Sequence, residues 1–146
     1  MTKVLFVCTG NTCRSAMAKA IADDRFRRLG LPYGADSRGI NVLAPSRASE
    51  NAVRALSLLY KIDLSPHISR QLSEGDMRGA DLVLTMTRSQ KDYLTMVYGP
   101  RAEKARTLAE FAGAGRDVAD PYGGDIAVYQ RCASTIADMI ERGFRE

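Results

Sequence analysis

The chain has 146 residues, of which 45% are hydrophobic and 26% charged, so it carries enough apolar material for one folded domain. Its formal net charge is +4, and the basic residues form no run of the kind that nucleic-acid-binding arms carry. No apolar stretch approaches the roughly 20 residues that span a bilayer. We therefore expect neither a nucleic-acid nor a membrane partner. The mild positive charge suits an anionic substrate and a solvated surface equally.

The cysteine content and the N-terminal segment indicate a cytoplasmic protein. Three cysteines are too few, and an odd number, for a secreted disulfide scaffold. The first apolar run is too short for a signal-peptide core, and no A-x-A-like cleavage site follows it. Reduced thiols are typical of the cytosol. We expect a single domain over residues 1–146 that is a monomer or a weak dimer.

Apolar patterning predicts strands and helices that alternate along the chain. In chain order, the predicted elements are a strand at 3–8, a helix at 14–29, a strand at 34–39, a helix at 47–60, a strand at 81–86, a helix at 88–98, an edge strand near 104–107 and a helix at 124–144. The apolar positions with helical spacing are Ala18, Ala22, Phe26 and Leu29, then Ala52, Leu56, Leu59 and Tyr60, and finally Tyr129, Cys132, Ile136, Met139 or Ile140, and Phe144.

This order predicts an α/β fold, in which a short parallel sheet of about four strands is covered by helices on both faces in a single three-layer domain. The runs at 3–8 and 81–86 are continuously apolar, as in strands that are buried on both faces. Ligands in such folds bind beyond the carboxyl ends of the strands, at a switch point. The loop at residues 8–14 is expected to lie there.

The segment CTGNTCRS, residues 8–15, joins the first predicted strand to the first predicted helix. Successive backbone N–H groups in such a turn form an anion-binding nest, and the helix dipole adds positive potential. Gly10 and Asn11 are the residue types that best tolerate the left-handed backbone of a tight nest. Arg14 carries a planar guanidinium that can hold two phosphate oxygens. These features predict a phosphate-binding loop formed by Thr9, Gly10, Asn11, Thr12, Cys13, Arg14 and Ser15.

Cys8 stands at the base of this predicted loop. A helix N-terminus favours the thiolate form of a cysteine, and the Ser15 hydroxyl is placed to donate a hydrogen bond to it. We infer nucleophilic attack on phosphorus through a cysteinyl-phosphate intermediate. The C-x5-R spacing is weak by itself, and a buried cysteine followed by a surface arginine is the alternative interpretation. A G-x4-G-K-[ST] loop is missing from the sequence, so nucleotide-dependent phosphoryl transfer is not expected.

The leaving group in such a reaction needs a proton. The segment VADPYGGD, residues 118–125, offers Asp120, and Pro121 biases that residue toward an extended backbone. Tyr122 can form an apolar wall for a flat substrate group. An ordinary Asp-Pro turn before a helix is the alternative. Because the upstream loop lacks an acid of its own, we favour Asp120 as a general acid.

These segments resemble those of the low-molecular-weight protein tyrosine phosphatases. VCTGNTCRS resembles their phosphate-binding loop and DPYGG their acid loop, and the runs DSRGI, HISRQL and ADLVLTMT also agree. The resemblance covers residues 3–144. It implies that Cys8 is the nucleophile, that Arg14 clamps the phosphate and the transition state, and that Asp120 is the general acid and then the base.

The resemblance also implies supporting residues. Ser15 is implied to stabilise the Cys8 thiolate, and Asn11 to hold the loop in its strained shape with Ser37 as a hydrogen-bond partner. The only histidine, His67, matches a structural histidine. No metal and no cofactor are expected, and the implied partner is a phosphorylated protein substrate.

Thr12 bears on the choice of substrate. Many tyrosine-specific members carry Ile at this position, whereas a bacterial subset that carries Thr, with Gly-Gly after the acid loop, resembles protein arginine phosphatases. A threonine offers a hydroxyl and less bulk, which suits a polar guanidinium better than an aryl ring. We favour phosphoarginine as the substrate. The alternatives are phosphotyrosine as substrate and Thr12 as a tolerated β-branched substitute.

The other cysteines suggest regulation and rival activities. A Cys8–Cys13 disulfide would trap an oxidised Cys8 reversibly, which gives the hypothesis of redox-reversible inactivation. Cys132 is assigned to the core. An arsenate reductase would need further downstream cysteines, and residues 80–100 hold none. A phosphate-binding module without turnover would be expected to lose Cys8 or Asp120, and a general thiol oxidoreductase would use the spacing C-x-x-C.

Overall fold

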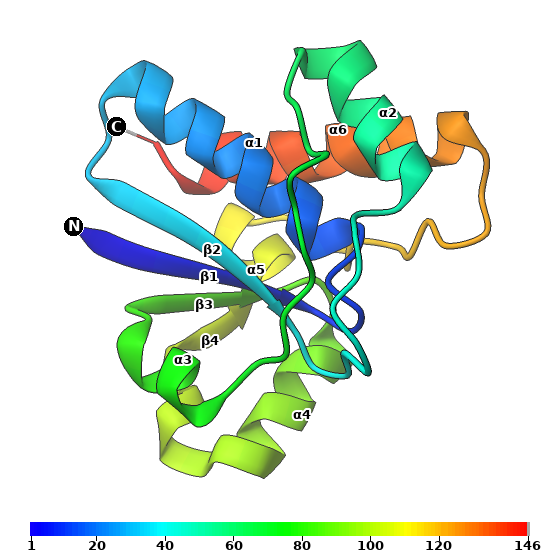
Figure 1. Cartoon of the computed structure of the whole chain (residues 1–146). Coiled ribbons are helices and arrows are strands. Elements are labelled where there is room, and N and C mark those ends of the chain that lie inside the picture. The colour runs from blue at the N-terminus through cyan, green and yellow to red at the C-terminus, as the bar shows by residue number, and fades with distance from the viewer. Residues whose placement is uncertain (146) are drawn as a thin grey trace.

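The computed structural model describes residues 1–145, which form a four-stranded parallel sheet between two layers of helices (Figure 1). The strands β1 (Thr2–Cys8), β2 (Tyr33–Gly39), β3 (Leu82–Thr85) and β4 (Ala105–Thr107) lie in the order β2-β1-β3-β4. Because β1 has β2 on one side and β3 on the other, its carboxyl end lies at the switch point of the sheet. The predicted α/β fold is confirmed.

The helices are α1 (Arg14–Leu29), α2 (Glu50–Tyr60), α3 (Glu74–Gly79), α4 (Arg88–Tyr98), the 3-10 helix η1 (Gly99–Lys104), α5 (Leu108–Ala112) and α6 (Ile126–Gly143). Alternate residues of β1 reach opposite layers. Val4 and Phe6 pack with α1, α2, α5 and α6, whereas Leu5 and Val7 pack with α3 and α4. All four side chains are buried, as the continuous apolar run predicts for a strand covered on both faces.

The predicted second helix is wrong at its start and in part of its buried face. Residues 47–49 are extended, because Arg47 pairs with Ile68 and the helix begins only at Glu50. Leu59 and Tyr60 are exposed, and the last turn of α2 rises away from α1 and α6 in Figure 1. Leu29, in the last turn of α1, is also exposed. The predicted stripe of α6, including Cys132, is buried throughout.

Three short helices, α3, η1 and α5, were not predicted. Helices of this length show too little periodicity to stand out from a loop. Two of them begin with a capping box, formed by Ser73 with Asp76 and by Thr107 with Glu110. This pattern was present in the sequence as a start signal. Within residues 1–145, no helix is both long enough and apolar enough to cross a lipid bilayer.

Candidate active site

Residues 8–15, called here the phosphate loop, turn around Asn11. This residue has a φ of 58° and is fully buried. Its side-chain amide donates to Ser15 Oγ at 2.7 Å and to Ser37 Oγ at 3.0 Å, and its side-chain carbonyl accepts from the backbone N–H of Arg70 at 3.0 Å. The ring of His67 donates from Nε2 to the Asn11 backbone carbonyl at 2.7 Å. These four bonds stabilise a left-handed conformation that is unfavourable for a residue other than glycine.

The glycine that this loop requires is Gly39 rather than Gly10. Of the two residues that tolerate a left-handed backbone, Asn11 adopts it, whereas Gly10 is not among the positive-φ glycines of residues 1–145. A Cβ at Gly39, in contrast, would lie 2.8 Å from the Thr9 carbonyl oxygen and 3.0 Å from Asn11 Cβ. Strand β2 therefore approaches the phosphate loop more closely than a side chain allows.

Cys8 lies at the base of the phosphate loop with two hydrogen-bonding groups on its sulfur. Ser15 Oγ is 2.8 Å from Cys8 Sγ, and the backbone N–H of Asn11 donates to the sulfur at 3.2 Å. The Ser15 hydroxyl already accepts from Asn11, so its own hydrogen is free to point at the sulfur. Both groups can therefore donate to a sulfur anion.

Arg14 connects the phosphate loop to residues 118–125, called here the acid loop. Its Nη1 donates to the Val118 carbonyl at 3.0 Å, and its Nη2 lies 3.7 Å from Asp120 Oδ2. The Nε of Arg14 is buried and has no hydrogen-bond partner among residues 1–145. A buried donor of this kind is costly unless a ligand satisfies it, and a phosphate oxygen would do so.

The acid loop leaves its polar and aromatic side chains open to solvent. The Asp120 side chain is 54% exposed, and its Oδ1 accepts from the backbone N–H of Tyr122 at 3.1 Å. Tyr122 is 86% exposed. Asn51 of α2 donates to the Gly124 carbonyl at 3.3 Å and so connects α2 to this loop. The carboxylate is thus oriented by its own loop and remains reachable from outside.

Thr12 faces the start of α2. Its backbone carbonyl accepts from the N–H of Ser49, the N-cap residue of α2, at 2.9 Å. The residue is half-buried. The N-terminus of α2 is therefore placed against the phosphate loop, and this bond fixes the backbone of Thr12.

All three cysteines are free thiols. Burial, followed by the charge of Cys8, raises the pKa of Cys13 to about 11. Burial also raises the pKa of Cys132 to about 12, and its thiol faces the Ala119 carbonyl at 3.8 Å. Both groups are therefore protonated at neutral pH.

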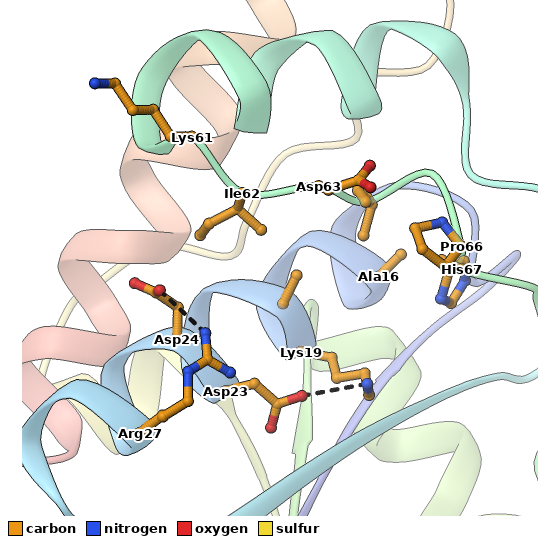
Figure 2. A pocket seen from close by; sticks show the side chains of 12 residues that line it. Ala16, Lys19, Asp23, Asp24, Arg27, Lys61, Ile62, Asp63, Pro66 and His67 are labelled. Carbon is orange, nitrogen blue, oxygen red and sulfur yellow. Dashed lines mark hydrogen bonds and ion pairs between the residues drawn. The ribbon is translucent and has the colours of Figure 1, made fainter.

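A hollow of about 430 Å³ lies behind the phosphate loop, between α1 and residues 61–67 (Figure 2). Its charged side chains are largely paired with each other. Figure 2 shows Lys19 joined to Asp23, and Arg27 joined to Asp24. Burial lowers the pKa of His67 at the edge of this hollow, so the ring is neutral at pH 7. We assign the hollow no part in the chemistry.

The amino-acid sequence of this chain matches that of a known protein family. Residues 3–146 match the family described as low molecular weight phosphotyrosine protein phosphatase. The chain belongs to that family. It is 36% identical to the protein-arginine-phosphatase of Bacillus subtilis over 140 residues, which are 95% of this chain and 92% of that protein.

Two solved structures of this phosphatase family agree closely with the fold. The low molecular weight protein tyrosine phosphatase from T. tengcongensis has a TM-score of 0.94, with 42% identity over 97% of both chains. A mutant of the arginine phosphatase YwlE with a phosphorylated active-site serine has a TM-score of 0.91, with 36% identity over 97% of this chain and 92% of that one. By family, the chain is a cysteine-dependent protein phosphatase.

The structure brings most of the predicted site residues together. Hydrogen bonds link Cys8, Asn11, Ser15 and Ser37 into one set, and a separate ion pair joins Arg14, the chain neighbour of Ser15, to Asp120. Sequence reasoning missed the contacts that Arg70 and Gln90 make from outside the two loops, and the contact of the Val118 carbonyl within the acid loop. A backbone donor or acceptor leaves no residue-type signal. Gln90 could have been noticed as the glutamine of a Thr-x-x-Gln capping box that begins at Thr87.

Proposed function

We propose that this phosphatase removes phosphate from phosphorylated proteins with Cys8 as the nucleophile. Cys8 Sγ attacks phosphorus, and the bond from phosphorus to the leaving group breaks as Asp120 gives that group a proton. Water then attacks the cysteinyl phosphate, Asp120 takes the proton back, and inorganic phosphate leaves. Arg14 is proposed to hold two phosphate oxygens throughout.

One observation carries this proposal. The guanidinium of Arg14 contacts the acid loop through Val118 and Asp120, while its buried Nε is unpartnered among residues 1–145. A dianion bound in the phosphate loop would satisfy that Nε and lie between the Cys8 sulfur and the Asp120 carboxylate. The remaining loop residues, from Thr9 to Cys13, are proposed to supply backbone N–H groups to the same anion.

Phosphoarginine is the substrate that we favour. Thr12 is half-buried, and its backbone is fixed by Ser49, so its side chain presents a small polar surface at a constant position. In this reaction the phosphorus–nitrogen bond breaks, and Asp120 protonates the departing guanidine nitrogen. The relative from B. subtilis is named for arginine phosphatase activity, which supports this choice.

Phosphotyrosine is the second candidate. The T. tengcongensis relative, at 42% identity, is named a protein tyrosine phosphatase. Tyr122 is proposed as the wall on which a flat substrate group would pack. The arsenate-reductase and thiol-oxidoreductase alternatives are less favoured, because Cys13 and Cys132 have raised pKa values of about 11 and about 12.

We further propose that the enzyme works in the cytoplasm and is switched off reversibly by a Cys8–Cys13 disulfide. Three free thiols suit a reducing compartment. We propose a monomer or weak dimer, which sedimentation velocity at several concentrations would test.

The decisive experiment compares phosphate release from matched phosphoarginine and phosphotyrosine peptides in EDTA. Wild type, Cys8→Ser and Thr12→Ile are assayed side by side. Preference of the wild type for phosphoarginine, reversed by Thr12→Ile, would support the substrate assignment. Preference for phosphotyrosine would make Thr12 incidental. If the wild type released no more phosphate than Cys8→Ser from either peptide, the proposed activity would be wrong.

A further inference from the structure

Gln90 is a buried polar side chain that lies outside both loops of the site. It is 5% exposed and occupies the third position of α4. Its Oε1 accepts from the backbone N–H of Thr87 at 3.1 Å and from that of Met86 at 3.0 Å. Its Nε2 donates to the Thr9 hydroxyl at 3.1 Å, across 81 residues of sequence. Capping a helix needs only the oxygen of such a side chain, so the bond to Thr9 is an additional function of the amide.

Thr9 is the residue that follows Cys8. Its backbone carbonyl accepts from the N–H of Asn41 at 2.9 Å, and its hydroxyl is held by Gln90. Thr9 is thus held through both its backbone and its side chain. A shift of Thr9 would move its neighbour Cys8 relative to the bound phosphate.

The turn that Gln90 caps also holds the acid loop. The Met86 carbonyl accepts from the Val118 N–H at 3.0 Å, and the Val118 carbonyl in turn accepts from Arg14. One residue beyond the turn, the Arg88 N–H donates to Asp117 Oδ1 at 3.1 Å. Residues 86–88 therefore contact the segment that carries Asp120, while Gln90 contacts the segment that carries Cys8.

We propose that Gln90 is a positioning residue that fixes the phosphate loop and the acid loop to one turn. In this way Cys8 is held toward the phosphorus atom, and Asp120 toward its leaving group, in a constant geometry. The inference rests on the proposed function for its catalytic consequence. Its effect on phosphate binding can be measured without any turnover.

Two substitutions separate the two functions of the side chain. Gln90→Glu keeps an acceptor for Met86 and Thr87 but removes the N–H donor and places a negative charge beside the phosphate loop. Gln90→Met removes all three hydrogen bonds at similar volume. The matched control is Thr107→Ala, which removes the N-cap hydroxyl of the capping box on α5 and leaves Gln90 and its contact with Thr9 in place.

The experiment measures inorganic phosphate affinity by calorimetry, kcat on a phosphopeptide and the thermal midpoint for each variant. We expect both Gln90 variants to bind phosphate about tenfold more weakly and to lose about tenfold to a hundredfold in kcat, since small misplacements of reacting groups carry such costs. Thr107→Ala is expected to lower the thermal midpoint while phosphate affinity and kcat stay within about twofold of wild type.

A double-mutant cycle with Thr9→Val tests the contact itself. Thr9→Val and Gln90→Met should be non-additive in phosphate affinity, whereas Thr9→Ser, which keeps the hydroxyl, should behave as wild type. Additivity, or a Gln90→Met variant that loses only thermal stability as Thr107→Ala does, would overturn the inference. A wild type that binds phosphate without hydrolysis would refute the proposed function alone, and the cycle would still decide the role of Gln90. A wild type that binds no phosphate would overturn both.

Discussion

Nη2 of Arg14 lies 3.7 Å from Oδ2 of Asp120, although the two residues belong to loops at opposite ends of the chain. The pair connects the proposed phosphate clamp to the proposed proton donor before any substrate binds. Arg14 is almost fully buried and Asp120 is half-exposed, so the arginine is the fixed partner and the carboxylate the accessible one. This relationship leads to the first prediction.

Asp120→Asn should lower kcat by roughly 10²- to 10⁴-fold on the phosphopeptide that the wild type prefers, because the leaving group loses its proton donor. The kcat on a substrate such as p-nitrophenyl phosphate, whose leaving group needs little protonation, should fall much less. Inorganic phosphate should bind at least as tightly as in wild type, since a negative charge beside Arg14 is gone. Equal losses of kcat on both substrates would argue against Asp120 as the general acid.

Ser15→Ala should slow alkylation of Cys8 by iodoacetamide at pH 7 and lower kcat by about tenfold or more. The change removes a hydroxyl that lies 2.8 Å from the sulfur, and a hydrogen bond to a charged group contributes about 1.5–3 kcal/mol. Ser65→Ala is the control, because that hydroxyl contacts only the exposed Asp63. Unchanged alkylation kinetics in Ser15→Ala would show that the hydroxyl does not act on the sulfur.

Gly39→Ala should destabilise the fold by about 1–3 kcal/mol and weaken phosphate binding, because the new Cβ would press on the Thr9 carbonyl and on Asn11. Chemical denaturation and phosphate calorimetry measure the two effects. Gly79→Ala is the matched control. A Cβ at Gly79 meets nothing within 4 Å, so that variant should match or slightly exceed wild-type stability. A Gly39→Ala variant with the stability and phosphate affinity of wild type would mean that the phosphate loop moves aside freely.

Glu110→Gln should reduce the free energy of unfolding by about 1 kcal/mol at pH 7 and by progressively less as the pH falls. The backbone N–H of Thr107, and next the ammonium of Lys91, lower the pKa of Glu110 from 4.5 to about 2. Because the folded-state pKa is depressed, the stabilisation is complete above about pH 5 and is lost between about pH 4.5 and pH 2. The carboxylate is 40% exposed, so solvent screens the pair with Lys91 and keeps the effect small.

Urea denaturation of wild type and Glu110→Gln from pH 7 to pH 2.5 measures this dependence. Glu74→Gln is a suitable control. The Glu74 carboxylate is paired with two basic side chains, Arg78 and Arg101, but it lies more exposed than Glu110, at the surface of α3. A difference between wild type and Glu110→Gln that stays constant with pH would contradict the prediction.

Closure of the proposed Cys8–Cys13 disulfide should be slow at neutral pH and accelerate as the pH rises. Peroxide converts Cys8 to a sulfenic acid, and the Cys13 thiolate then attacks that sulfur and releases hydroxide. The pKa of Cys13 is about 11, and burial, its larger cause, persists after Cys8 is oxidised. The closure rate should therefore rise roughly tenfold per unit between pH 7 and pH 9.

Mass spectrometry of peroxide-treated protein, quenched at intervals, measures this rate. Cys13→Ser cannot form the bond and should instead proceed to irreversibly oxidised Cys8. Finding no Cys8–Cys13 disulfide at any pH would refute the proposed redox switch.

The sequence specified the parts of this protein whose signals are local. The apolar run of β1 and the helical spacing of α1 gave both elements almost to the residue, because periodic burial is written in adjacent positions. The phosphate loop and the acid loop were likewise recognisable, since each carries its chemistry within eight residues. The short helices, and the exposure of the last turns of α1 and α2, could not be recognised in the sequence. Which of their residues are buried depends on neighbours elsewhere in the chain.

The tertiary structure decided which groups complete the site. Asn11 is held by contacts from Ser37, His67 and Arg70, and Arg14 meets the Val118 carbonyl across 104 residues of sequence. The choice of Gly39 over Gly10 as the required glycine follows from a close approach between β2 and the phosphate loop. Such contacts join residues that are distant in sequence, and three of these four hydrogen bonds use a backbone atom, which is the same in every residue. The sequence by itself therefore determined the chemistry, and only the folded sheet determined what holds that chemistry in place.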